Sequence, residues 1–441
     1  MAVQIPFTTI TEISDTSVVG DGFFADLLQL NQPPTDQPQW LKEIRQQFIT
    51  LSANLSLPTR QDEDWRFIDL SPLKQEKFVA GGANVSVNYD LSSTEIASCH
   101  LVFVNGLYSA ELSDTSALPK GVYVGNLGNL PSEYDAAKYL AKQHNQKAAF
   151  TALNTAGSLD VAVIWVAKDV KVESPIHLVF IADGDDTIFI QPRTLVIAQT
   201  GADITLVEEY RGRGKYFTNA VTEIFVEANA KINHTRLQQE SETSFHIATT
   251  AVSQARDSHY TINELNLGAK IFRHNPEILQ QGEQTETNLN GLTVATGEQT
   301  ADTHSIIALT KPYGTTDQLH KCIISDRAQT IFNGKVFVPK EAQLTDATQL
   351  NRNLLLSPKA RVNTKPELQI TADNVKCAHG ATVSQLEAEE IFYLRSRGLS
   401  EADANQLLID AFAAEIIDRI PVEFLRTKIT QIIEKKILQK T

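Results

Sequence analysis

A chain of 441 residues with 42% hydrophobic residues can fill a sizeable core, and its length fits two or three domains. Its 53 acidic and 39 basic residues give a formal net charge of −14, which repels phosphate backbones and anionic lipids and excludes them as expected partners. The apolar run at 161–167 is far shorter than the roughly 20 residues of a spanning helix, and the first six residues carry no cationic side chain. We therefore expect a soluble cytoplasmic protein without a targeting signal. Three sparse cysteines fit a reducing compartment better than a disulfide scaffold.

Residues 1–157 are expected to form an N-terminal helical and mixed cap. Ile44, Phe48 and Leu51 recur at steps of three and four after the turn-prone segment 32–36, which predicts an amphipathic helix. Short strands are expected near 101–104 and 122–124. Nothing in this region indicates chemistry.

Residues 158–380 change to a period of two, which predicts many short strands and almost no helices. Val161, Val163 and Trp165 begin this pattern. Repeating strands without intervening helices fit either a sheet sandwich or a solenoid of β-coils. Small residues recur just before strands, where successive coils would approach closely, and they favour the solenoid: Ala202, Ala230, Ala269 and Ala360.

Residues 381–441 are expected to form a C-terminal helical domain. Ser400 followed by Asp403 predicts the start of a helix that contains Phe412 and ends near Pro421. A second amphipathic helix contains Leu425 in its apolar stripe. Such a stripe packs on its own domain or docks a partner, and the residues alone leave both alternatives open.

The segment around Cys377 and His379 combines metal-binding chemistry with a predicted turn. If residues 373–379 are extended, the thiol and the imidazole share one strand face and can hold a thiophilic metal from one side. Gly380 is expected to turn the backbone sharply, and Ser384 with Glu387 predicts a capping box for a helix that begins there. The alternative is a packed thiol beside a hydrogen-bonded core histidine.

Other candidate chemistry is weaker. No phosphate-binding Gly-Lys loop and no serine nucleophile elbow is present. His234 falls on the apolar phase of a strand and is expected to be a satisfied core histidine, and the remaining histidines show no tight metal-binding spacing. Paired acids in a β-solenoid would suit a carbohydrate-active enzyme, but adjacent acids at strand ends are typical of solvated faces. These acids are Glu208, Glu209, Glu223 and Glu227.

Several motifs, in order along the chain, resemble the SufD subunits of the SUF iron–sulfur cluster assembly machinery. Residues 57–67, with Glu63, Trp65 and Arg66, are similar to the family's Pro-x-x-x-x-Glu-x-Trp-Arg motif. Further similar segments are 104–108, 150–154, 174–178, 332–336, 349–357, 365–368 and 376–398. The sister subunit SufB shares the Cys-x-His element, whereas Gly380 and residues 394–398 resemble SufD.

This resemblance implies a right-handed parallel β-helix core and a non-enzymatic scaffold that pairs with SufB and docks the ATPase SufC. It implies that His379, with Cys377 as a neighbour or second ligand, holds a transient iron–sulfur cluster shared with SufB. Phe412 and Leu425 are the expected contacts for SufC. A SufB-type paralogue and, more distantly, a carbohydrate-active solenoid are the alternatives, and a homodimer is the alternative assembly for the chain alone.

Overall fold

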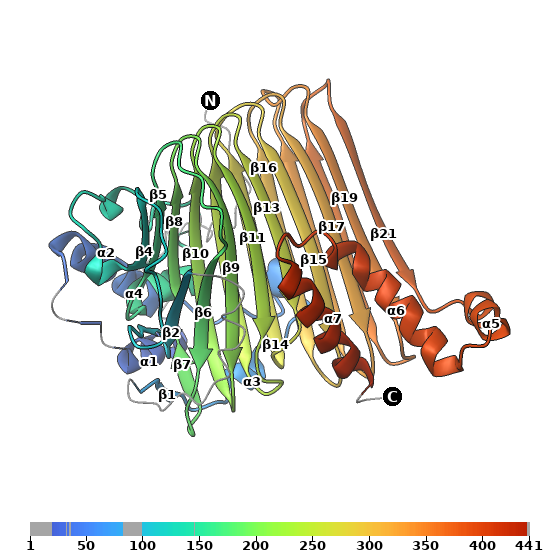
Figure 1. The fold of residues 1–441 in the computed structure, drawn as a ribbon. Coiled ribbons are helices and arrows are strands. Elements are labelled where there is room, and N and C mark those ends of the chain that lie inside the picture. The colour runs from blue at the N-terminus through green and yellow to red at the C-terminus, as the bar shows by residue number, and fades with distance from the viewer. Residues whose placement is uncertain (1–19, 32, 35–36, 83–98, 145, 439–441) are drawn as a thin grey trace.

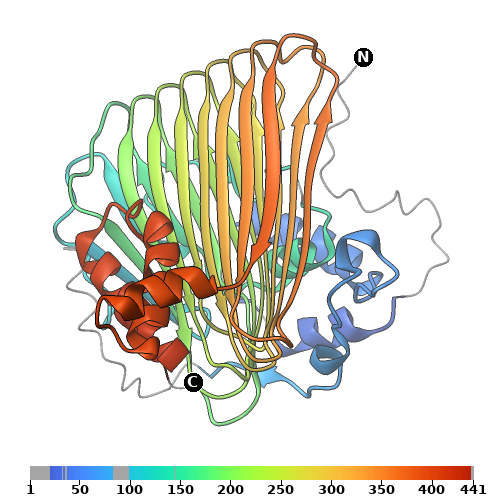
Figure 2. The same cartoon turned by 90° about the vertical axis from the view of Figure 1, so that its right-hand side faces the viewer.

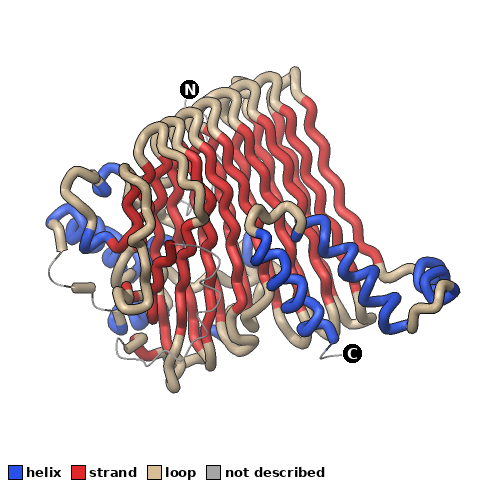
Figure 3. The backbone as a smooth tube through the Cα atoms, viewed as in Figure 1, coloured by secondary structure: helices blue, strands red, loops and turns tan. Residues whose placement is uncertain are grey.

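The chain forms a solenoid of two β-sheets (Figure 1). Successive side chains of each strand point to opposite faces, so they lie in turn inside and outside the solenoid. The computed structural model describes residues 20–31, 33–34, 37–82, 99–144 and 146–438. From Arg193 onward, successive strands alternate between the two sheets, so that a coil adds one strand to each. The β-helix expected from the sequence is confirmed, and Figure 3 shows its strands side by side along the length of the molecule.

The first sheet contains the strands β1 (Val79–Ala80), β4 (Val122–Asn126), β5 (Ala162–Val166), β7 (Ile188–Ile190), β8 (Arg193–Ala198), β10 (Tyr216–Val226), β12 (Phe245–Gln254), β14 (Ile271–Gln280), β16 (Thr300–Leu309), β18 (Gln329–Val338) and β20 (Arg361–Ile370). The second sheet contains β2 (Cys99–Val104), β3 (Leu107–Tyr108), β6 (Ile176–Ala182), β9 (Asp203–Gly212), β11 (Lys231–Gln239), β13 (His259–Asn266), β15 (Glu286–Ala295), β17 (Thr315–Ile324), β19 (Asp346–Leu355) and β21 (Lys376–Ser384). The predicted short strands near 101–104 and 122–124 are present as β2 and β4, so the region expected as a cap also contributes to the solenoid.

Equivalent residues of successive coils stack in parallel register. Ile232 of β11, for example, lies between Ile204 of β9 and Tyr260 of β13. All three point inward and are buried in one apolar cluster that fills part of the lumen. Ala202 and Ala230 are fully buried at the corners just before β9 and β11, as expected for turns where coils approach closely.

In the part of the N-terminal region that the structure describes, four α-helices lie beside the first coils: α1 (Phe23–Leu30), α2 (Gln39–Ala53), α3 (Ser71–Lys74) and α4 (Ala149–Gly157). The predicted amphipathic helix is α2, and it buries Leu41 and Phe48. Phe24 and Phe150 pack in one apolar cluster with Phe217 from the outer face of the first sheet. Figure 2 shows these helices on the side of the solenoid opposite to the C-terminal helices.

Three helices follow β21: α5 (Ala388–Ser396), α6 (Glu401–Ile417) and α7 (Glu423–Leu438). The predicted start of α6 is confirmed, because the Ser400 hydroxyl oxygen accepts a hydrogen bond from the Asp403 backbone N–H at 3.1 Å. Figure 1 shows α6 and α7 lying across the outer face of the second sheet. Strand β21 continues four residues beyond the predicted core boundary at residue 380.

Candidate functional site

Strand β21 is the last strand of the second sheet and has an open edge. It pairs with β19 in parallel register, and no other strand in the described ranges pairs with it. Strand β20 ends the first sheet in the same coil. The solenoid therefore ends at the β20–β21 coil, where the lumen and a row of backbone hydrogen-bonding groups face away from the preceding coils.

Cys377 and His379 lie on the inward face of β21. Cys377 is the register partner of Ala347, and His379 is the register partner of Gln349, both of which are buried in the lumen. Cys377 is half-buried and packs against the main apolar cluster, whereas His379 is exposed. The structure thus brings the two side chains to one face, at the end of the solenoid where another subunit can reach the imidazole.

Two local expectations for this segment are wrong. Gly380 does not turn the chain: it lies within β21 as the register partner of Leu350. Ser384 and Glu387 form no capping box, because Ser384 is still paired with Leu354 in the sheet. Helix α5 instead begins at Ala388, and its N-cap residue Glu387 makes no side-chain capping hydrogen bond.

The donor set of this site is incomplete for a metal or a cluster. Burial raises the pKa of the Cys377 thiol above its usual range, which favours the protonated thiol until a metal displaces the proton. Within the described part of the chain, no group of three or more His, Cys, Asp or Glu side chains is arranged to hold a metal ion. A thiol and an imidazole fit iron chemistry, but the remaining ligands of a cluster must come from outside this chain.

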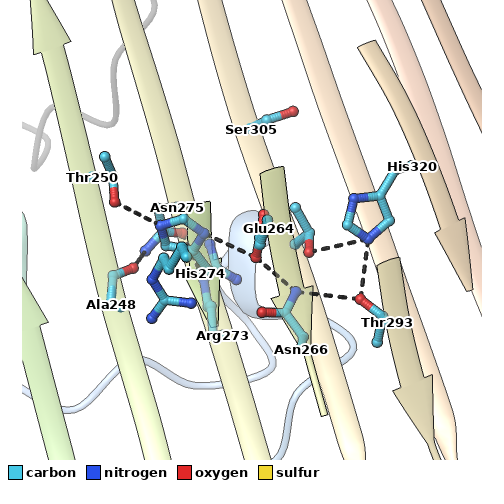
Figure 4. A network of polar contacts seen from close by, with 12 residues as sticks. Ala248, Thr250, Glu264, Asn266, Arg273, His274, Asn275, Thr293, Ser305 and His320 are labelled. Carbon is cyan, nitrogen blue, oxygen red and sulfur yellow. Dashed lines mark hydrogen bonds and ion pairs between the residues drawn. The ribbon is translucent and has the colours of Figure 1, made fainter. Parts of the chain in front are cut away.

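A buried polar network lines the lumen in the coils that precede the open end of the solenoid (Figure 4). His274 Nδ1 lies 2.9 Å from Glu264 Oε1, and the Thr250 hydroxyl lies 2.9 Å from the other ring nitrogen. Glu264 accepts a hydrogen bond from Asn266 at 2.7 Å. Asn266 also contacts Thr293, whose hydroxyl lies 3.1 Å from His320 Nε2. The network therefore joins strands of both sheets inside the lumen.

This network holds a neutral histidine. Burial lowers the pKa of His274 to about 4, although the Glu264 carboxylate opposes that change. His274 and His320 belong to separate coils, which is why their distance along the sequence showed no metal-binding pattern. Hydrogen bonds between equivalent strands of the second sheet span 27 to 31 residues, and that repeat is the signal that would have placed Thr293 beside His320.

The side-chain amides of Gln349 and Gln318 lie on the same inward face of the second sheet as His379. Gln349 Nε2 donates a hydrogen bond to Gln318 Oε1 at 2.8 Å, and Gln318 Nε2 donates to the Ser305 hydroxyl at 2.8 Å. The Oε1 atom of Gln349 is buried and has no hydrogen-bond partner among the residues that the structure describes. Gln349 begins the segment 349–357 that resembles SufD but was not among the predicted site residues, and it is the inward-facing neighbour of His379 one coil earlier.

Most of the acids expected to form solvated strand ends are buried. Glu208, Glu209 and Glu223 are fully buried, so the expectation of a solvated face is wrong for these three. Glu208 Oε2 lies 3.2 Å from Nε2 of His234, whose other ring nitrogen lies 3.0 Å from the Tyr260 hydroxyl. His234 is therefore the satisfied core histidine that was predicted. Buried and paired acids provide no open carboxylate groove for a sugar polymer.

The motif at residues 57–67 lies against the outer face of the first sheet. The Arg273 guanidinium lies 4.0 Å from the centre of the Trp65 ring, and Lys365 Nζ of β20 lies 3.1 Å from Glu63 Oε1. Cavities of about 600 and 320 Å³ flank this segment and share Glu63 and Asp64 in their walls. The motif thus ties the N-terminal region to several coils, including the terminal one.

The two predicted partner contacts on the C-terminal helices differ in accessibility. Leu425 is 0% exposed and packs against the second sheet, so its side chain is not available to another protein. Phe412 is half-buried, and Lys321 Nζ lies 4.2 Å from the centre of its ring. Leu407 on α6 and Phe424 on α7 are 48% and 42% exposed and are the better candidates for a docking contact.

Family models match two consecutive stretches of the chain. The SufBD protein N-terminal region matches residues 29–178, and the SufBD core domain of SUF-system iron–sulfur cluster assembly matches residues 180–412. A two-sheet solenoid with these two regions defines the class of SUF-system assembly proteins.

Curated relatives agree with these matches. The chain is 48% identical to an iron–sulfur cluster assembly SufBD family protein of Synechocystis sp., over 88% of this chain and 89% of the relative. It is 37% identical to the chloroplastic protein ABCI7 of Arabidopsis thaliana, over 88% and 84% of the two chains. It is 32% identical to SufD of Escherichia coli, over 87% and 90%. The chain belongs to the SufBD family, and the resemblance to SufD found in the sequence is confirmed.

No helix in the described ranges is long and apolar enough to cross a membrane.

Proposed function

We propose that this chain is a non-enzymatic scaffold subunit of a cytoplasmic SufBCD-type complex that assembles iron–sulfur clusters. The observation that carries the proposal is the position of Cys377 and His379 on one face of β21, at the open end of the solenoid. The incomplete donor set supports a cluster shared between two subunits, because this chain supplies at most two ligands there. The SufBD family membership supports cluster assembly as the process.

In this proposal a SufB-type subunit pairs with the open coil and supplies the other ligands of a transient cluster. An unpaired strand edge is a ready template for a strand from another chain. His379 is exposed and provides an imidazole nitrogen, while the half-buried Cys377 is a neighbour or a second ligand. Imidazole is a borderline ligand, so a mixed site releases its cluster more readily than a site of thiolates alone. Release of the product is what a scaffold requires.

The C-terminal helices are the proposed docking element for a SufC-type ATPase. Their inner faces hold α6 and α7 on the second sheet, and their outer faces present Leu407 and Phe424. Exposed apolar side chains on a helical layer favour contact with another protein. Nucleotide hydrolysis by that partner would supply the energy for rearrangement, since this chain has no phosphate-binding loop.

The test is co-expression of the chain with the SufB-type and SufC-type subunits of the same organism. The His379→Ala variant should assemble the complex with unchanged stoichiometry and thermal midpoint but with a sharply reduced content of iron and sulfide. Cys377→Ser should show a smaller loss if the thiol only packs, and a comparable loss if it is a ligand. A wild-type cluster content in the His379 variant would refute the ligand role, and turnover of ATP by the pure chain would refute the scaffold role.

A further inference from the structure

One corner of the solenoid carries a stack of residues in the left-handed backbone region. In each of seven successive turns that lead into strands of the second sheet, one residue has a φ between 56° and 74°. The residues are Asp169, Gly201, Asn229, Asp257, Gln284, Tyr313 and Leu344. The backbone N–H of each donates to a carbonyl of the next coil, as from Tyr313 to Gln343 at 3.0 Å and from Leu344 to Asn374 at 2.7 Å. We call this stack the corner ladder.

The residue types in the corner ladder change along the solenoid. The first four positions hold Asp, Gly, Asn and Asp, which adopt the left-handed region most readily. The positions nearest the open end hold Tyr313 and Leu344, whose bulky side chains make that backbone conformation strained. Strain of this kind persists in a chain only where some other interaction compensates for it.

The ladder hydrogen bonds hold the backbone in this conformation, but they require no bulky apolar side chain at these positions, and burial within this chain does not account for one. Tyr313 is 51% exposed and Leu344 is 46% exposed, so much of each side chain faces solvent. They occupy equivalent positions of adjacent coils and form a two-residue apolar ridge, which we call the corner ridge. An asparagine or a glycine at either position would suit the backbone better and would remove the exposed apolar surface.

The corner ridge is continuous with the open edge of β21. The Leu344 backbone N–H bonds to Asn374, in the turn that leads directly into β21. A strand added to the edge of β21 would extend the second sheet by one position, so the chain that carries it would also pass this corner. Figure 1 shows the corner at the upper edge of the solenoid, away from α6 and α7, so the helices proposed to dock the ATPase do not cover it.

We propose that Tyr313 and Leu344 form a contact surface for the subunit that pairs with the open edge of β21. This inference rests on the proposed function and names a second surface for the same partner. The complementary surface on the SufB-type subunit would be apolar and uncharged, because an aromatic ring and an aliphatic side chain bury against such a surface without leaving a charge unpaired. The two exposed apolar side chains are then buried in the complex.

The experiment compares stability with affinity in the Tyr313→Asn/Leu344→Asn double variant of the full chain. Asparagine adopts the left-handed region, so the Tm of the isolated variant should rise by about 2 °C. Its Kd for the SufB-type subunit of the same organism should increase about tenfold or more, because two contact side chains are truncated. Gln284→Asn is the matched control: it lies on the same ladder one coil further from the open end, and its Kd should equal that of the wild type.

The outcomes separate this inference from the proposed function. A fall in Tm would show that the ridge stabilises the chain itself, and would overturn the inference. A raised Tm with an unchanged Kd would overturn it as well, while pairing at β21 would stand. If the wild-type chain does not bind the SufB-type subunit at all, the proposed function is refuted, and this inference is refuted together with it.

Discussion

Gln349 and His379 are register partners on β19 and β21, so their side chains lie next to each other on the inward face at the open end of the solenoid. Gln349 is buried and held by its hydrogen bond to Gln318, and its Oε1 atom has no partner among the described residues. An imidazole that binds a metal through one nitrogen commonly donates its other N–H to such an acceptor. Gln349 is therefore placed to act as a positioning residue for His379.

We expect Gln349→Met to accelerate cluster loss from the assembled complex about tenfold, because the imidazole loses its acceptor while the apolar volume is retained. Iron release to a chelator, followed by absorbance, measures the rate. Ser305→Ala removes the next link of this chain of hydrogen bonds but leaves the bond between Gln349 and Gln318 intact, so it should release iron at close to the wild-type rate. Equal rates for Gln349→Met and the wild type would contradict a positioning role.

The C-terminal helices provide a second prediction, about which of their faces contacts the ATPase. Leu407→Asp and Phe424→Asp place a charge on exposed positions, so the chain should remain folded by circular dichroism but lose the SufC-type subunit in co-purification. Leu425→Ala instead removes a fully buried side chain and should lower the free energy of unfolding by about 2 to 5 kcal/mol. Retained ATPase in both Asp variants would place the docking surface elsewhere.

A third prediction concerns the ion pair that ties α6 to the second sheet. Lys321 Nζ lies 2.7 Å from Glu415 Oε2, and the Lys321 side chain is buried beneath the helix. Glu415→Gln leaves that ammonium group without its carboxylate and should reduce the free energy of unfolding by about 1 to 3 kcal/mol. Arg352 contacts the same carboxylate from an exposed position, so Arg352→Gln should cost less than about 1 kcal/mol. Urea denaturation of both variants measures the difference.

The buried His274 predicts how stability depends on pH. Its pKa is lowered to about 4 in the folded chain, so between pH 6.5 and pH 4 the unfolded chain binds a proton that the folded chain does not. Stability is therefore lost as the pH falls through this window, by about 3 kcal/mol for this group. His274→Gln should show a correspondingly smaller loss between pH 7 and pH 4 in urea denaturation. An identical loss in the variant would show that His274 already titrates normally in the folded chain.

Periodicity along the chain predicted most of the fold. The alternation that begins at Val161, the amphipathic spacing in α2 and the Ser400 cap of α6 are local patterns, and each determines an element without knowledge of the rest. The choice of a solenoid over a sandwich needed the small residues at corners and the family resemblance. For the site, Cys377 and His379 are two residues apart in a strand, so their common face could be read from the sequence.

The errors arose where contacts between coils decide the structure. Gly380 has the turn-forming potential of any glycine, but the ladder with β19 keeps it extended. Glu208 and Glu223 are charged residues, yet Glu208 is enclosed in the lumen beside His234, and Glu223 is covered on the outer face by the N-terminal region, where the Ala141 backbone N–H donates to it and Arg193 pairs with it. Gln349 became a candidate only when its register with His379 was known. The sequence does not reveal this register, because it depends on the lengths of several turns.

The two ends of the solenoid differ, and this difference limits how many solenoids can join. At the N-terminal end, the sheets finish in the short strands β3 and β4, which run antiparallel to their neighbours and interrupt the parallel stacking. The β20–β21 coil at the other end keeps the parallel pattern up to its last strand. A head-to-tail polymer would need two matching ends, whereas contact between two open ends uses both of them at once. The pairing proposed at β21 would therefore be self-terminating: it would join two solenoids and leave no open end of the same kind from which a fibre could grow.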